Sequence, residues 1–272
     1  MVRMTPLRLF SLCFAVLVAG AYAPAQAHFQ LLIPSDDVVT HRERRAVDLE
    51  VRFTHPFEDQ GVPMARPRRL GVWVAGRDQD LSDRLQPVQV RDRTGASLPA
   101  FTLGYKFRKP GDHLFYVIPQ PFWDESEEFF LLQYTKVVVN TFGLEEGWNH
   151  ELGSAAGLEA EIVPLTRPYG LWTGNVFQGV VKFKGKPVPG ARVAVEYYNQ
   201  DGSVRAPADP FITQVVHADA NGVFTYAMPR AGWWGFAALA DDSRTMERKG
   251  KAYPFHVEAV LWVRTHDMQQ GH

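Results

Sequence analysis

Three histidines lie where an ordered strand is expected to begin or end, and each offers a nitrogen donor for a metal ion. His28 precedes an alternating segment, residues 29–33, in which Phe, Leu and Ile share one face. His55 closes a second alternating segment, residues 46–55, and His113 follows a Pro-Gly-Asp turn at the start of a third strand. Imidazole is the commonest protein ligand for transition metals. We therefore predict that His28, His55 and His113 converge on one metal site.

The residues before His28 read as a secretory signal peptide, residues 1–27. Arg3 and Arg8 form a basic start, Leu9 to Ala21 is a short apolar run, and Ala-Gln-Ala at 25–27 is a small-x-small cleavage site. Cleavage after Ala27 would make His28 the first residue of the mature chain. Its free α-amine and its imidazole could then close a chelate ring on a single ion.

An amine with up to three imidazoles is a nitrogen-rich donor set, and it contains no sulfur because Cys13, the only cysteine, lies in the predicted signal peptide. Such sets suit Ni²⁺, Co²⁺, Cu²⁺ or Zn²⁺ rather than Mg²⁺ or Ca²⁺. Met64 could be a soft axial neighbour, and Glu58 and Asp59 could support the ligands, although packing and solvation are the simpler interpretations of all three. Since free α-amine and imidazole titrate at about 8 and 6.5, metal binding should weaken at acid pH.

Each histidine also has a simpler interpretation: a chain end for His28, a hydrogen-bonded core residue for His55 and a turn residue for His113. The other six histidines are set aside because they fall in predicted loops, charged turns or near the polar terminus, or, for His256, form a single surface pair with Glu258. The Trp233-Trp234-Phe236 cluster could stack a sugar, but its spacing favours a strand in a sandwich core. The acidic run 124–128 is typical of solvated loop charges. No nucleophile, phosphate-loop or dinucleotide motif occurs, so we expect a binding protein and not an enzyme.

The elements that must position these residues are predicted to be β-strands throughout. Short β-branched and aromatic segments alternate with turns rich in Gly, Pro, Asn and Asp, and the pattern of residue types changes near Pro164. We predict an all-β fold with two β-sandwich domains, residues 28–164 carrying the metal site and residues 165–272 forming a Greek key. Residues 185–191 followed by 219–224 and an aromatic strand resemble the prealbumin-like sandwich of carboxypeptidase regulatory domains.

Composition limits the partners. The formal net charge is −1, which does not favour nucleic acid or an anionic membrane surface. No segment after the predicted signal peptide approaches the roughly 20 apolar residues that a spanning helix needs. The expected location is the periplasm, without direct lipid binding.

Read as a whole, the chain resembles a family of exported bacterial proteins that accompany energy-coupling-factor type nickel and cobalt importers as periplasmic accessory components, and whose members are often described only by a domain of unknown function. The resemblance is carried by residues 27–35, 53–56, 111–116, 134–139, 168–175 and 231–238. It implies a metal site at His28, His55 and His113, Ni²⁺ or Co²⁺ as the ion, and the membrane part of an importer as the partner. The second sandwich would be a rigid support or a docking surface.

Two alternatives remain open at this stage. An amine and imidazoles could hold copper as a histidine brace, either to cleave polysaccharide oxidatively or to handle copper. The chain could instead be an envelope adhesion or structural module whose histidines lie far apart. The positions of the three rings distinguish the alternatives, since a shared site requires them to meet at one point.

Overall fold

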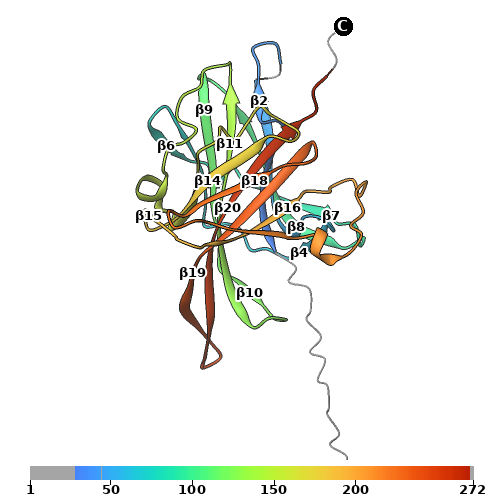
Figure 1. Ribbon diagram of the computed structural model, residues 1–272, viewed down its shortest axis with the longest axis vertical. Helices are drawn as coiled ribbons and strands as arrows, with labels where there is room; N and C mark the ends of the chain where they lie inside the picture. The colour runs from blue at the N-terminus through green and yellow to red at the C-terminus, as the bar shows by residue number, and fades with distance from the viewer. Residues whose placement is uncertain (1–27, 44, 270–272) are drawn as a thin grey trace, which may run out of the picture.

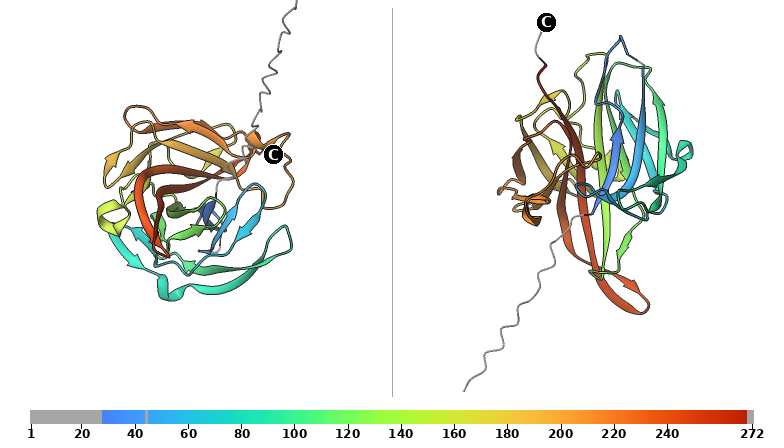
Figure 2. Two further views of the ribbon diagram at one scale, coloured as in Figure 1. Left: turned by 90° about the horizontal axis from the view of Figure 1, so that it is seen from below. Right: turned by 90° about the vertical axis from the view of Figure 1, so that its right-hand side faces the viewer.

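The computed structural model describes residues 28–43 and 45–269, and within them the chain is almost entirely β-strand. The predicted signal peptide, residues 1–27, lies outside the described residues. The strands form three sheets, of which the largest lies in the middle (Figures 1 and 2). The all-β, sandwich-like fold class is therefore confirmed.

The first sheet has the order β1-β3-β8-β7, with β4 paired to β3. The central sheet has the order β17-β16-β19-β20-β11-β9-β5-β6, with β10, β13 and β2 attached, and the third has the order β12-β14-β15, with β18 attached. The bounds of the strands in the first sheet are β1 Phe29–Pro34, β3 Ala46–His55, β4 Gln60–Val62, β7 Gln86–Arg91 and β8 Ser97–Lys106. Those in the central sheet are β2 Val38–Val39, β5 Arg69–Val74, β6 Arg77–Asp80, β9 Gly111–Ile118, β10 Phe122–Asp124, β11 Phe129–Thr141, β13 Leu171–Trp172, β16 Arg192–Tyr197, β17 Gln214–His217, β19 Gly232–Arg248 and β20 Lys251–His266. Those in the third sheet are β12 Ala160–Pro164, β14 Val176–Phe183, β15 Lys186–Pro187 and β18 Val223–Ala227, and single helical turns occur at Ser82–Arg84, Gly153–Gly157 and Asp209–Phe211.

The central sheet is covered on both faces, so its strands serve two hydrophobic cores. In β9, Leu114 and Tyr116 pack into the core beneath the third sheet, whereas Phe115 and Val117 pack into the core beneath the first sheet. Neighbouring residues of a strand point to opposite faces. A strand buried on both faces reads as a nearly continuous apolar run, which explains why residues 129–139 show no polar alternation.

Hydrogen bonding crosses the predicted domain boundary at residue 164. β11 pairs in parallel with β20, from Phe130 opposite Phe255 to Val137 opposite Trp262. β12, which precedes the boundary, pairs with β14, which follows it. The two sandwiches therefore share one sheet, and the division into residues 28–164 and 165–272 stays a prediction from composition.

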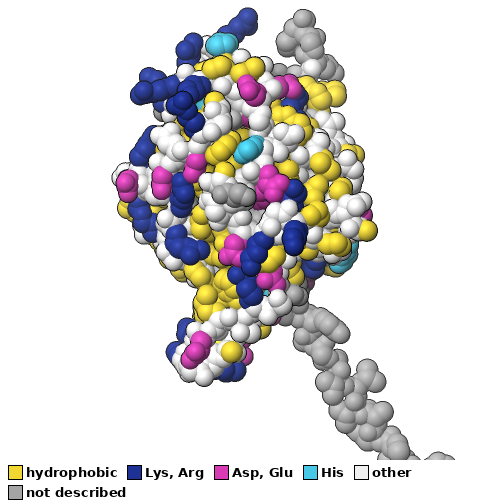
Figure 3. Space-filling view, turned by 90° about the vertical axis from the view of Figure 1, so that its left-hand side faces the viewer, with side chains coloured by type: hydrophobic (Ala, Val, Ile, Leu, Met, Phe, Trp, Pro, Cys, Tyr) yellow, Lys and Arg dark blue, Asp and Glu magenta, His cyan; other side chains and the backbone are white. Residues whose placement is uncertain are grey.

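Two hairpins project from the body at the end where β1 begins (Figures 1 and 2), and the space-filling view shows a protrusion there (Figure 3). One joins β10 to β11, and the other joins β19 to β20 through Lys249 and Gly250, whose φ angles of 52° and 76° suit a tight hairpin turn. Arg248 lies over the Trp123 ring at 4.8 Å, and Tyr253 contacts the same ring at 4.7 Å between centroids. The longer hairpin thus braces the shorter one. No helix in the described ranges is long and apolar enough to cross a membrane.

The end of β20 is joined to the segment after β1 by an imidazole–carboxylate pair. His266 Nε2 lies 2.8 Å from Oδ1 of Asp37, which is fully buried. The hydrogen bond to Asp37 raises the pKa of His266 above its usual value, against the opposing effects of burial and of Arg264. The stabilisation by the charged imidazole is therefore fully present below about pH 6.5 and is lost as the pH rises through the raised pKa.

We predict that His266→Asn lowers the melting temperature more at pH 6 than at pH 8.5. Thermal unfolding of both proteins at the two pH values measures the difference. The exposed His217→Asn serves as the control and should show no such trend. If His266→Asn lowered the melting temperature equally at both pH values, the stabilisation would not come from a charged His266 imidazole beside Asp37.

Candidate metal centre

His28 and His55 are brought together by the register of the first two long strands. β1 and β3 are antiparallel, with Phe29 opposite Thr54, so the next position places residue 28 opposite residue 55. The two imidazole rings lie 4.2 Å apart between centroids, tilted by 43°. This pair is the part of the predicted site that the structure brings together.

Aromatic side chains wall the histidine pair. The His28 ring stacks on Phe53 at 5.5 Å and meets Phe122 at 5.6 Å between centroids. The side chain of His28 is 16% exposed, and His55 is 8% exposed. Both imidazoles are therefore largely shielded from solvent.

A buried carboxylate completes the cluster. Asp124, at the end of β10, has an Oδ2 atom 3.5 Å from His28 Nδ1. Its Oδ1 accepts hydrogen bonds from the backbone and hydroxyl of Ser126 and from the backbone of Glu127. Oδ2 is buried and has no hydrogen-bond partner among residues 28–43 and 45–269. A buried carboxylate oxygen without a hydrogen bond is costly unless a cation lies beside it.

Sequence reasoning missed Asp124, because it grouped this residue with the solvated acids of 124–128. The structure corrects that interpretation: Asp124 is 3% exposed. The sequence signal for this role was the spacing Asp-x-Ser. In that motif the aspartate side chain accepts a hydrogen bond from the backbone N–H two residues later and so caps the turn. Such a turn holds the carboxylate in place before the site is assembled.

Burial and charge set the ionisation of these groups. Burial lowers the pKa of His28, against the opposing charges of Asp124 and Glu127. Burial tends to raise the pKa of Asp124, but hydrogen bonds from Ser126 and Glu127 and the nearby His28 outweigh it, so that pKa lies below its usual value. At neutral pH the cluster accordingly presents a neutral imidazole beside a carboxylate.

Gln133 fastens the start of β1 to the central sheet. Its Nε2 donates to the His28 carbonyl at 2.6 Å and to Glu258 at 2.7 Å, and its Oε1 accepts from the Gln30 amide at 2.7 Å. Trp262 Nε1 donates to the Gln30 carbonyl at 2.9 Å. The backbone that carries His28 is therefore held by side chains of β11 and β20.

We predict that Gln133→Met lowers the free energy of unfolding by about 2–4 kcal/mol, because it leaves two buried backbone groups without partners. Urea denaturation measures this loss. Gln89→Met, on an exposed strand position, is the matched control and should change it by about 0.5 kcal/mol or less. Equal stabilities for the two variants would show that Gln133 does not anchor the strand.

His113 does not join the pair. It is 1% exposed, its ring packs on Phe107 at 4.8 Å and Tyr105 at 5.8 Å, and its Nδ1 lies 3.2 Å from the Gly111 carbonyl. Burial lowers its pKa to about 4. In the central sheet, His113 lies opposite Val139 of β11. Val139 is six residues from Gln133, which holds the start of β1, so His113 lies about 20 Å along β11 from that anchor. The predicted convergence of three histidines is corrected here: His113 belongs to the core beneath the first sheet.

The predicted neighbours and the remaining aromatic cluster can also be placed. Asp59 is ion-paired with Arg52, Glu58 lies half-buried in the turn after β3, and Met64 packs against the core beneath the first sheet. In the described ranges, no group of three or more His, Cys, Asp or Glu side chains is already arranged to hold a metal ion. The Trp233-Trp234-Phe236 cluster is buried, which confirms its assignment to a core.

The fold and the site together define an all-β layered sandwich protein with a largely buried histidine pair at the start of its first strand and a buried carboxylate from β10 beside it. The chain belongs to the family defined by a domain of unknown function, DUF4198, whose model matches residues 25–242. Comparison with curated proteins by sequence gives no match.

Similar solved structures are distant. They include a bacterial ice-binding adhesin (8% identity, TM-score 0.24, 90% of this chain and 66% of the other) and trypsin-activated alpha-2-macroglobulin from Escherichia coli (11%, 0.26, 88% and 16%). The fibronectin(III)-like modules of Clostridium thermocellum CbhA are a third (8%, 0.20, 90% and 100%). The chain thus spans less than two thirds of the length of the first two. At these scores the likenesses carry no functional argument.

Proposed function

We propose that the mature chain begins at His28 and binds a divalent transition-metal ion, Ni²⁺ or Co²⁺, in the periplasm. The ligands would be the α-amine and imidazole of His28, the imidazole of His55 and the carboxylate of Asp124. The observation that carries the proposal is the position of the His28 ring, which lies 4.2 Å from the His55 ring between centroids and, at Nδ1, 3.5 Å from a buried Asp124 oxygen without a hydrogen bond.

The chemistry of this donor set supports the ion class. Three nitrogens and one oxygen favour late first-row divalent ions, and the absence of thiolate disfavours Cu⁺. The buried carboxylate supplies negative charge that a cation would neutralise, beside a His28 ring that packs against Phe53 and Phe122. The residues present therefore fit a divalent cation better than an anion or a neutral molecule.

The proposed role is to hold the ion and present it to the membrane part of an importer, without catalysis. Support comes from the predicted signal peptide and from the resemblance to importer accessory proteins. The start of β1 lies at the end of the molecule from which two hairpins project, so a partner could approach the ion and the hairpins together (Figure 1).

A second candidate is copper handling. With His113 set apart, the nitrogen donors that remain are one amine and two imidazoles, which is the donor set of a histidine brace. The burial of His55, which is 8% exposed, and of His28, which packs against Phe53 and Phe122, favours storage or delivery of copper over attack on a polysaccharide surface.

Calorimetric titration of protein that begins at His28 tests both candidates with Ni²⁺, Co²⁺, Cu²⁺ and Zn²⁺. We predict that His28→Ala and His55→Ala weaken Ni²⁺ binding by about 100-fold or more, and that Asp124→Asn weakens it by about tenfold. One alanine added before His28 removes the chelating amine and should act like His28→Ala. Preferential tight binding of Cu²⁺ alone would favour the second candidate.

His113→Leu is the matched control and should leave the affinity unchanged. Its loss is tolerable because the Gly111 carbonyl also accepts from the Thr141 hydroxyl at 3.0 Å. Unchanged Ni²⁺ affinity in His28→Ala, in His55→Ala and in the extended protein would overturn the proposal.

A further inference from the structure

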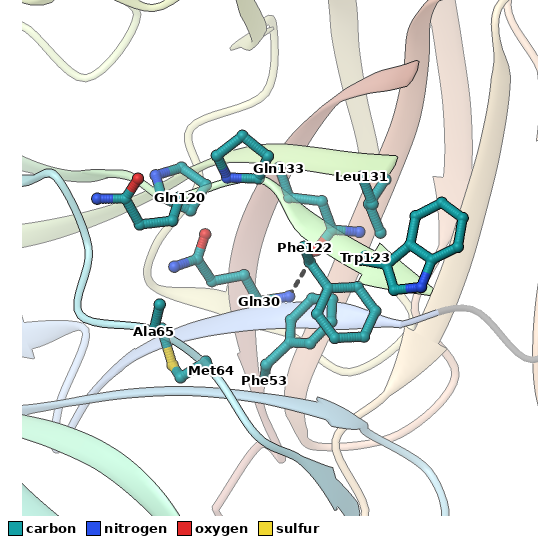
Figure 4. A pocket seen from close by; sticks show the side chains of 11 residues that line it. Gln30, Phe53, Met64, Ala65, Gln120, Phe122, Trp123, Leu131 and Gln133 are labelled. Carbon is teal, nitrogen blue, oxygen red and sulfur yellow. Dashed lines mark hydrogen bonds between the residues drawn. The ribbon is translucent and has the colours of Figure 1, made fainter. Parts of the chain in front are cut away.

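A pocket lies beside the candidate metal centre and shares two of its aromatic side chains. It has a volume of about 170 Å³ and is lined by β1, β3, β10 and β11 and by the segments 64–65 and 119–121. Phe53 and Phe122 belong both to this pocket and to the wall of the metal centre. Figure 4 shows the side chains that face into it.

One polar side chain in this pocket has unused hydrogen-bonding capacity. Gln30 is 2% exposed, and its Oε1 accepts from the Thr135 hydroxyl at 3.3 Å. Its Nε2 has no hydrogen-bond partner in the described part of the chain. If the amide nitrogen and oxygen of Gln30 were exchanged, Thr135 could still hydrogen-bond to only one of these two atoms, and the other would remain without a partner in the described part of the chain. Figure 4 shows the Gln30 amide extending between Met64 and Ala65 on one side and Gln120 on the other.

The remaining lining is mainly apolar and aromatic. Phe53 and Phe122 lie 4.8 Å apart between centroids, and Trp123, Leu131 and the Met64 thioether complete the walls. Thioether and aromatic groups make favourable contacts with flat rings. An apolar recess with one directed polar group is the usual design of a small-molecule site.

We propose that this pocket binds a small, flat, uncharged organic molecule carrying a hydrogen-bond acceptor such as a carbonyl. The acceptor pairs with Gln30 Nε2, and the ring lies against Phe53 and Phe122. The size follows from the volume, because cavities of about 150 Å³ hold one benzene ring. The proposal does not depend on metal binding, since Gln30, Met64 and Ala65 are not among the proposed ligands.

Acetophenone and α-methylstyrene test the proposal as a pair of probes, because they have nearly the same shape and only acetophenone has a carbonyl acceptor. Saturation-transfer NMR and titration with the full mature chain measure both affinities. We expect both to bind the unaltered protein. Gln30→Leu should weaken acetophenone by about tenfold while leaving α-methylstyrene within about twofold, since one net hydrogen bond is lost.

Ala65→Phe fills the mouth of the pocket and should abolish binding of both probes. Ala96→Phe, in the exposed turn between β7 and β8, is the matched control and should bind both as the unaltered protein does. Thermal unfolding establishes that each variant is folded. The proposal is overturned if neither probe binds the unaltered protein, if Ala65→Phe still binds them, or if Gln30→Leu leaves acetophenone unaffected.

Discussion

β11 and β20 run side by side in parallel, although Gln133 and Glu258 in the two strands are 125 positions apart in the chain. Parallel neighbours require a crossover connection, and here the crossover includes β12, β14, β15 and β18, which form the third sheet. The pairing therefore places one core above the shared sheet and another below it. It also brings Gln133, Glu258 and Trp262 beneath the start of β1, where they hold the backbone of His28 and Gln30.

The polar groups of the candidate metal centre depend on three different segments. The register of β1 and β3 places the two imidazoles together, and the turn after β10 holds the Asp124 carboxylate near the His28 ring. The β19–β20 hairpin holds β10 in turn, through Arg248 and Tyr253 against Trp123. Side chains on strands that are packed from several sides vary little in position, which is what a site of fixed geometry needs.

Local patterns in the sequence predict much of this structure. The alternation in residues 46–55 coincides with the bounds of β3, and the shared face of His113, Phe115 and Val117 points into one core. Alternation indicates which face a residue occupies, but it does not identify the strand or core on the other side. For that reason the sequence indicated that His28 and His55 could bind together and wrongly added His113, whose face meets Tyr105 and Phe107.

Neither the shared sheet nor the burial of Asp124 could be predicted from the sequence, for a physical reason. Partners of a strand are chosen by the packing of the whole chain, and nothing local to residues 130–137 specifies residues 255–262. Likewise, the burial of Asp124 beside His28 depends on contacts between β10 and distant segments and not on its acidic neighbours. Long-range contacts, and not local propensity, are the part of the fold that the sequence left undetermined.

The bond between the Trp262 indole and the Gln30 carbonyl joins positions 232 residues apart. β1 and β3 are close in the chain and can pair early in folding, whereas the Gln30 carbonyl cannot accept this hydrogen bond until β20 has joined the sheet. Contacts that close such large loops form late and slowly. A chain truncated before residue 262 would therefore lack this anchor for the segment that carries His28.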